Sequence, residues 1–124
     1  MKKHEIEVRD RYGNTAAYRE HEKKTKNYTK EKWTATNDGL MAIFAEFAKY
    51  KSSKFAPNSL EVQSLVGKLQ DFITKNYYTC TNEILAGLGQ MYVVDERFKK
   101  NIDKYGEGTA EFASKAITTY CKRN

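Results

Sequence analysis

The sequence predicts an all-helical fold in a single domain, and three observations carry this prediction. The chain has 124 residues, a length that suits one core of moderate size. It holds one proline, Pro57, and seven glycines, which are fewer turn residues than a β-sandwich needs. Its apolar side chains recur near the helical period of 3.6 residues, in segments that begin at Ser, Thr or Asp.

The N-terminal part of the chain is its least apolar part. Residues 3–12 and 15–26 have the pattern of charged, weakly amphipathic helices, and Gly13-Asn14 between them is a turn signal. Because such helices have little apolar area to bury, we expect residues 1–28 to form a flexible segment, loosely held on its own. Residues 29–124 are then the helical core of the one domain.

Two long helices are expected next, separated by a loop at residues 52–58 that contains Pro57. Thr29, followed by an acidic residue, is a predicted N-cap for a helix that ends near Lys51. Ser59 is the predicted N-cap of the second helix. The apolar stripes of the two helices are Trp33, Leu40, Ile43, Phe44 and Phe47, and then Val62, Leu65, Val66, Leu69, Phe72 and Ile73.

The stretch GLGQMYVVDERF, residues 87–98, is read as a helix end, a corner and a helix start. Thr81 caps the first of these helices, on which Ile84, Leu88, Met91 and Tyr92 share a face, and Asp95 caps the second. Gly87 and Gly89 let something approach the backbone closely. Since Met91-Tyr-Val-Val also has strand propensity, a strand is the alternative, but it would lack a partner in a helical chain.

A last helix is expected after Gly106 and Gly108, which end the short helix before it. Thr109 is its predicted N-cap. Its inward side is formed by Phe112, Ala113, Ala116, Ile117 and Tyr120.

Charge and composition exclude several classes of protein. The net charge is +6, but acidic and basic side chains are mixed in residues 1–32, which is typical of solvated helix surfaces and argues against direct DNA binding. There is neither a membrane span nor an N-terminal signal peptide, so we expect a cytoplasmic location. Cys80 and Cys121 form neither a disulfide framework nor a metal knuckle, and free thiols are expected.

Enzymatic chemistry finds little support in the sequence. His4 and His21 lie in the charged N-terminal part, with no Ser or Cys at a spacing that suggests a catalytic dyad. Metal-ligand spacing and a phosphate-binding glycine loop are both absent. The adjacent carboxylates of Asp95 and Glu96 are explained by a helix cap. We therefore predict no catalytic residues, no metal and no cofactor.

The aromatic side chains favour a binding function instead. Nine Tyr, six Phe and one Trp make up 13% of the chain. Most belong in the core, but a pocket lined by Tyr, Trp, Met and small residues suits a large apolar ligand. Cys80, just before the Thr81 cap, has two interpretations: a small apolar residue between helices, or a reactive thiol whose pKa the helix N-terminus lowers from about 8.5.

Several motifs together resemble one known family. These are VRDRYGNTAAYRE, NYTKEKW, NYYTCTNEILAGLGQMYVVDERF and GTAEFASKAI, which occur in that order between Glu7 and Tyr120. They resemble the TipAS antibiotic-recognition domain, the C-terminal effector domain of a branch of MerR-like transcription activators. The resemblance implies a globin-like helical fold without haem and a cleft that binds large, apolar, peptide-like antibiotics, above all thiopeptides. It also implies an N-terminal part that orders when ligand binds.

This chain departs from the family pattern in several ways. It has no helix-turn-helix and no long coiled coil, so we expect DNA to be reached only through an N-terminal domain absent here, with a homodimer possible in a full-length regulator. The chain would be a stand-alone drug-sequestering domain, an internally initiated product or a piece of a longer regulator. Tyr12 replaces a more common Trp. The cysteine that captures drug covalently in the thiopeptide-binding branch aligns with Gly87, and Cys80 matches a second cysteine, so reversible binding is expected.

The leading hypothesis is therefore non-enzymatic binding of a hydrophobic antibiotic, thiopeptide-type or other. The predicted ligand-binding residues are Tyr12, Tyr18, Trp33, Phe44, Tyr77, Cys80, Ile84, Leu88, Met91 and Tyr92, with the first two closing over the cleft. The alternative is an interaction or dimerisation module without a drug ligand. Haem binding is a weaker idea, since neither histidine belongs to a core helix stripe.

Overall fold

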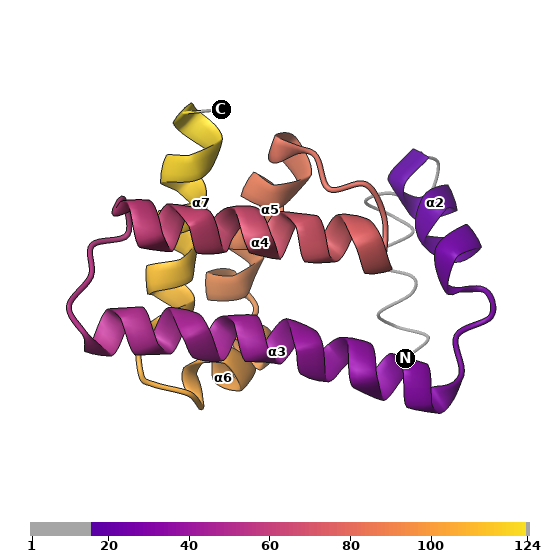
Figure 1. Ribbon diagram of the computed structural model, residues 1–124, viewed down its shortest axis with the longest axis horizontal. Coiled ribbons are helices and arrows are strands. Elements are labelled where there is room, and N and C mark those ends of the chain that lie inside the picture. The colour runs from indigo at the N-terminus through magenta and orange to yellow at the C-terminus, as the bar shows by residue number, and fades with distance from the viewer. Residues whose placement is uncertain (1–15, 124) are drawn as a thin grey trace.

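The computed structural model describes residues 16–123, and their side chains from Arg19 onward. Six helices are found within this part of the chain, and Figure 1 shows their arrangement. They are α2 (Ala16–Thr25), α3 (Lys30–Ser52), α4 (Leu60–Asn76), α5 (Asn82–Val94), α6 (Glu96–Asp103) and α7 (Thr109–Arg123). Helices α3 and α4 lie side by side in front of α5 and α7, and α2 lies at the end where α3 begins and α4 ends (Figure 1).

The helix boundaries follow the caps that the sequence predicts. Thr29, Ser59 and Thr81 have extended backbones, and each side-chain oxygen accepts the N–H of the residue three positions later. Asp95 caps α6 by accepting the N–H of Arg97. These contacts satisfy backbone donors that no helical carbonyl can reach. The stretch 87–94 is helical, so the strand alternative is wrong.

The start of α7 differs from the prediction that Thr109 is its N-cap. Thr109 is already the first helical residue, and its hydroxyl donates to the Gly106 carbonyl. The carboxylate of Asp103, at the end of α6, instead accepts the N–H of Ala110 at 2.8 Å. Gly108 precedes the helix with a φ of 85°, a conformation that favours glycine. The cap thus comes from another helix, which spacing alone does not reveal.

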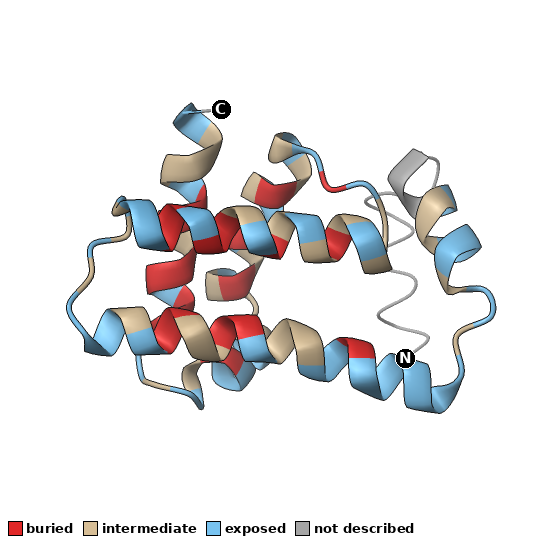
Figure 2. Cartoon of the chain, in the orientation of Figure 1, coloured by how far each residue is buried: buried red, intermediate tan, exposed pale blue. Residues whose placement is uncertain are grey.

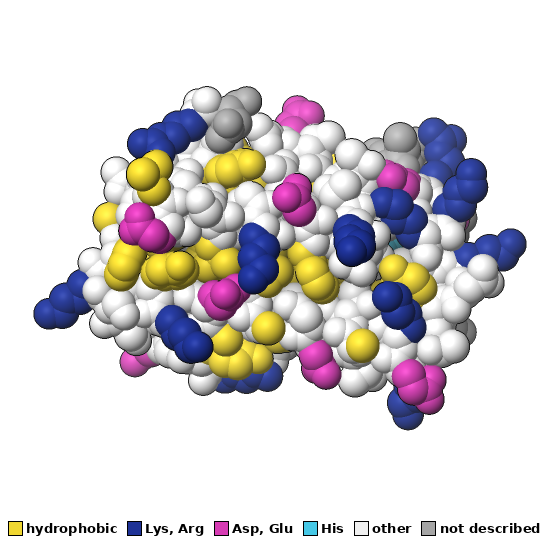
Figure 3. All heavy atoms as spheres, viewed as in Figure 1, with side chains coloured by type: hydrophobic (Ala, Val, Ile, Leu, Met, Phe, Trp, Pro, Cys, Tyr) yellow, Lys and Arg dark blue, Asp and Glu magenta, His cyan; other side chains and the backbone are white. Residues whose placement is uncertain are grey.

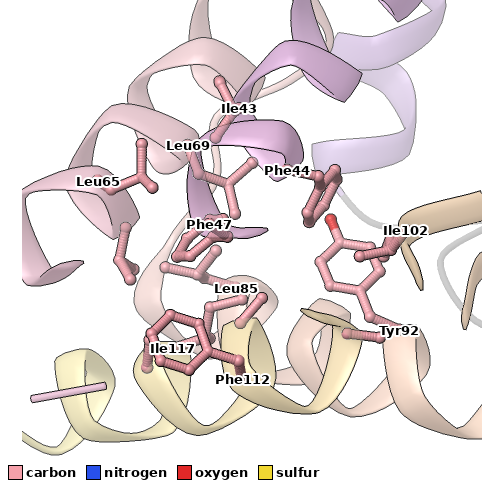
Figure 4. Close-up of a cluster of buried hydrophobic side chains, with 14 of the residues drawn as sticks. Ile43, Phe44, Phe47, Leu65, Leu69, Leu85, Tyr92, Ile102, Phe112 and Ile117 are labelled. Carbon is pink, nitrogen blue, oxygen red and sulfur yellow. The ribbon is translucent and has the colours of Figure 1, made fainter. Parts of the chain in front are cut away.

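The core lies between α3, α4, α5 and α7, where the red segments of Figure 2 face one another. Phe47, Val62, Leu69, Leu85 and Ile117 are fully buried there. Figure 4 shows Tyr92 beside Phe44 and Ile102 within this cluster. The apolar stripes predicted for α4 and α7 are largely buried, so the helical period identified the core.

Candidate functional site

The candidate site lies where α2 meets the end of α4 and the first turn of α3. Here the imidazole of His21, on α2, is surrounded by three aromatic rings that belong to other elements. We call Trp33, Tyr77 and Tyr78 the aromatic box. The centroid distances from His21 to these rings are 6.2, 6.1 and 6.2 Å, respectively, within the range in which aromatic rings interact favourably.

The walls of the aromatic box are positioned by helix ends. The Thr29 cap starts α3, so Trp33 follows within its first turn and donates its N–H to the Thr29 carbonyl. At the end of α4, Tyr77 and Tyr78 both donate their N–H groups to the Ile73 carbonyl, which turns the chain out of the helix. The ring centroids of Trp33 and Tyr77 are 6.2 Å apart. The two walls therefore contact each other directly.

A set of polar contacts holds α2 against this region, and we call it the α2 clasp. Glu20 Oε1 accepts the N–H of Thr79 at 2.6 Å, and Glu20 Oε2 accepts its hydroxyl at 2.7 Å. Lys24 Nζ donates to the Thr74 carbonyl and is 3.3 Å from Glu20 Oε2. The clasp joins one helix to a segment about fifty residues later in the chain.

Tyr28, after α2, closes the same side of the site. Its hydroxyl donates to the Asn76 carbonyl at 2.6 Å, and its ring lies 5.1 Å from that of Trp33 in an edge-to-face arrangement. Lys32 Nζ lies over the Tyr28 ring, 5.4 Å from its centroid. A cation therefore lies beside the aromatic box.

Electrostatics at the site follow from burial and hydrogen bonding. Burial lowers the pKa of His21, and the opposing effect of Glu22 is smaller, so the neutral imidazole is favoured. Burial also raises the pKa of Tyr77, and the neighbouring Tyr28 adds to this shift. Hydrogen bonds from Thr79 lower the pKa of Glu20, which keeps the clasp carboxylate ionised.

The structure brings several of the predicted ligand-binding residues together near the aromatic box. Tyr77 and Trp33 are walls of the box itself. Tyr92 is close enough to Tyr78, Cys80 and Tyr77 that these groups add to the rise in its pKa, although burial is the main cause. The box, the loop after α4 and the last turn of α5 are therefore neighbours.

The remaining predicted residues differ in exposure. Phe44 and Tyr92 are buried and pack edge to face at 5.1 Å, so both are core residues in this structure. Ile84, Leu88 and Met91 are half-buried against the core. Tyr12 and the side chain of Tyr18 lie outside the described residues. That these residues contact a ligand stays a prediction.

The reactive-thiol interpretation of Cys80 is not supported. The side chain is 4% exposed, and burial raises its pKa to about 12, with Cys121 adding to the shift. Desolvation thus outweighs the helix N-terminus that follows it. Burial also raises the pKa of Cys121, whose thiol donates to the Asn82 carbonyl at 3.2 Å. Both cysteines are free thiols.

The two glycines of α5, Gly87 and Gly89, differ in their surroundings. A Cβ on Gly89 would lie 3.0 Å from Ile117 Cγ2, so this glycine allows α7 to approach closely. Gly87 is exposed, and a Cβ there would meet nothing within 4 Å. The expected close approach is therefore found at Gly89, while Gly87 faces open space.

Sequence reasoning missed His21, Tyr28 and the clasp residues Glu20 and Thr79. His21 was expected to lie apart from the apolar helices because its segment is highly charged. A signal was present, since Tyr18, His21, Thr25 and Tyr28 are spaced by three, four and three residues, the period of one helical face. The stripe was inconspicuous because its members are aromatic or polar and not aliphatic.

Other kinds of site find less support within residues 16–123. No group of three His, Cys, Asp or Glu side chains there is placed to hold a metal ion. No helix in this range is long and apolar enough to cross a membrane. An open groove of about 500 Å³ runs between α3 and α4, where Figure 3 shows apolar side chains along the middle of the face. A second, more polar groove lies beside α7 at Lys115 and Arg123.

Comparison with known proteins gives consistent matches along the chain. Residues 4–120 match the family model of the TipAS antibiotic-recognition domain. The HTH-type transcriptional activator mta of Bacillus subtilis is 39% identical over 115 residues, which cover 93% of this chain and 44% of that protein. The HTH-type transcriptional activator TipA of Streptomyces coelicolor is 36% identical over 121 residues, covering 98% and 48%. The chain thus spans less than half the length of either relative.

A solved structure is similar over nearly the whole chain. It is TipAS in complex with nosiheptide, from a thiopeptide antibiotic multidrug resistance system of Streptomyces lividans. The TM-score is 0.85 at 35% sequence identity, and the match covers 98% of this chain and 85% of that one.

Proposed function

Because this chain belongs to the TipAS antibiotic-recognition domain family, we propose that it binds large, apolar, peptide-like antibiotics, thiopeptides above all, without catalysing a reaction on them. The family resemblance seen in the sequence is confirmed, and so is the globin-like helical fold. The corresponding domain of Streptomyces lividans is known in complex with the thiopeptide nosiheptide. The two activators that match are regulators whose DNA-binding part lies outside the region shared with this chain.

The observation that carries the proposal is the group of aromatic rings beneath α2. Trp33, Tyr77 and Tyr78 come from a helix start and a helix end, and α2 covers them through a few polar contacts at the surface. A surface of rings with polar tips suits a ligand that is largely apolar but carries amide groups. A helix held over that surface by the α2 clasp can reposition around such a ligand without disturbing the core.

Reversible binding is the form of capture that the thiols favour. Nucleophilic addition to a drug requires a thiolate, and burial raises the pKa of Cys80 to about 12. Burial also raises the pKa of Cys121, and Gly87, which the family resemblance aligns with the drug-capturing cysteine, has no side chain. The ligand would therefore be held by apolar contact and hydrogen bonds alone.

In a longer regulator, binding here would be relayed to a DNA-binding part of the kind that the two activators contain. As a domain on its own, the same binding would sequester drug. We place both activities in the cytoplasm, where an antibiotic would meet a transcription regulator. Ordering of residues 1–28 around the ligand would cost about 2–5 kcal/mol of the gross binding energy, so wide apolar contact is needed to offset it.

Thermal unfolding against a panel of thiopeptides, combined with intact-protein mass spectrometry, tests the proposal. Binding stabilises the folded chain by about 2.7 kcal/mol at a hundredfold excess over the dissociation constant, which raises the melting temperature measurably. We expect this rise with an unchanged protein mass. A mass adduct would contradict reversible capture. If no hydrophobic antibiotic raised the melting temperature and the chain formed a stable dimer, an interaction module would replace the proposal.

A further inference from the structure

The His21 imidazole occupies a place that other elements build for a flat ring. Its plane is within 5° of the plane of Tyr77, while Trp33 and Tyr78 meet it at 42° and 64°. One wall is therefore stacked with the imidazole, and two walls are inclined to it. This is the arrangement in which a planar aromatic group gains contact from several rings at once.

The walls belong to elements other than α2. The Thr29 cap and a backbone hydrogen bond hold the main chain at Trp33, and hydrogen bonds to Ile73 hold the main chain at Tyr77 and Tyr78. Among the described side chains of α2, His21 is the one whose ring lies within the box. If the imidazole were displaced, the three rings would still belong to α3 and to the end of α4.

We propose that the aromatic box is a ring-binding subsite, that His21 fills it from within the chain, and that a flat, uncharged aromatic ring of a ligand binds there in its place. The identity of the natural ligand rests on the proposed antibiotic-binding function, whereas the existence of the subsite does not. His21 is then an internal competitor that sets how tightly a ring-bearing ligand is held.

Burial decides the charge of the occupant. Where the imidazole of His21 lies, desolvation disfavours a positive charge more than Glu22 favours it. A cationic ring would meet the same cost, and Lys32 lies over the neighbouring Tyr28 ring. An anionic ring would have to leave water for a surface of aromatic rings, which is unfavourable. A neutral planar ring avoids both costs.

A cavity-and-rescue experiment tests this subsite directly. The variant His21→Gly removes the imidazole, and free imidazole at pH 8 is the probe, with tetrahydrofuran as an uncharged ring that is not aromatic. Trp33 is the one tryptophan of the chain, so its fluorescence reports on the box alone. We expect saturable binding of imidazole to His21→Gly, at least tenfold tighter than to the original chain, and no saturable binding of tetrahydrofuran.

Two further variants serve as controls. Lys23→Gly places the same glycine at an exposed position of α2 and should leave imidazole binding as weak as in the original chain. His21→Phe fills the box with a phenyl ring attached to α2. This variant should not bind imidazole, while α2 stays docked.

The proposal is overturned if His21→Gly shows no saturable imidazole binding, or if Lys23→Gly binds the probe equally well. Should α2 detach in His21→Gly, chemical shifts of Tyr77 and Tyr78 still report the box, because its walls belong to other elements. This test of the subsite uses small ring compounds and no antibiotic. Failure of the chain to bind any thiopeptide would therefore count against the proposed function, but it would not change the outcome of the imidazole experiment.

Discussion

At the scale of single residues, Gly87 and Gly89 show how two identical residues of one helix differ in packing. Gly87→Ala should stabilise the fold by about 0.5–1 kcal/mol, because alanine is the better helix former and the site is open. Gly89→Ala gains the same helical preference but brings its Cβ to 3.0 Å from Cγ2 of Ile117, which is fully buried and would have to shift within a packed core. Overpacking of this kind costs about 1–3 kcal/mol.

Denaturant unfolding of both variants measures this difference. We expect Gly89→Ala to be less stable than the original chain and Gly87→Ala to be more stable. A Gly89→Ala variant as stable as Gly87→Ala would mean that α5 and α7 can separate without cost. From the sequence the two positions are equivalent, since only the approach of α7 distinguishes them.

The two cysteines lead to a second prediction at this scale. With its pKa raised to about 12, Cys80 should react with iodoacetamide at pH 7.5 roughly a hundredfold more slowly in the folded chain than in denaturant. Cys121 is half-buried and should be modified first. Peptide mass mapping of partially alkylated protein gives the order. Rapid labelling of Cys80 in the folded chain would restore the reactive-thiol interpretation and weaken the case for reversible capture.

At the scale of helices, the sequence predicts individual elements well and their mutual docking poorly. The caps at Thr29, Ser59 and Thr81 act on donors within a few residues, so local spacing is sufficient to find them. The cap of α7 comes from Asp103, seven residues before the N–H that it accepts, and was missed. The α2 clasp spans about fifty residues and leaves no local pattern at all.

The clasp itself gives a prediction for α2. Glu20→Ala removes both hydrogen bonds to Thr79 and the ion pair with Lys24. We expect amide exchange in residues 16–25 to accelerate at least severalfold, while exchange in α4, α5 and α7 is unchanged. Lys23→Ala, on the exposed side of the same helix, is the control. Unaltered exchange in Glu20→Ala would show that the aromatic contacts alone hold α2.

The docking of α2 should also depend on pH through His21. Burial lowers its pKa in the folded chain below the ordinary value of about 6.5, although Glu22 opposes the shift; the rings that face it are Trp33, Tyr77 and Tyr78. A depressed histidine pKa contributes stability that is present above about pH 6.5 and is lost as the pH falls through the folded pKa. Acidification from pH 7.5 to 5 should therefore loosen α2.

Trp33 fluorescence followed against pH tests this sign, with His21→Gln as a variant that cannot be protonated. The original chain should show a transition below pH 6.5 that the variant lacks. Glu20, whose pKa Thr79 lowers, titrates only below its ordinary range near 4.5, so its effect falls in a separate window. A transition of equal size in His21→Gln would assign the change to another group.

At the scale of the whole molecule, the core and the candidate site follow from different kinds of information. Helical periodicity predicts the stripes of α4 and α7, because every buried residue of a stripe repeats the same local relation. The site instead combines single residues from α2, from the start of α3 and from the end of α4. Phe44 and Tyr92 carried the same aromatic signal as Trp33 and Tyr77, yet they pack against each other in the core. Composition cannot distinguish the aromatic residues of the core from those of the site, because the difference depends on where the chain folds back.

Because the core and the candidate site draw on different elements, we can predict the behaviour of a shortened chain that begins at Thr29. The buried core residues from Ile43 to Ile117 belong to α3–α7 and the loop between α4 and α5, and the described side chains of α2, from Arg19 onward, contribute none of them. Residues 29–124 should therefore fold cooperatively, with full helical content for their length and a modest loss of stability from exposing Trp33, Tyr77 and Tyr78. Their affinity for a thiopeptide that binds the full chain should fall at least tenfold, because the covering helix is gone. Circular dichroism, thermal unfolding and calorimetric titration give these three quantities. A shortened chain that binds as tightly as the full one would show that residues 1–28 take no part in closing the site, and one that does not fold would place them within the core domain.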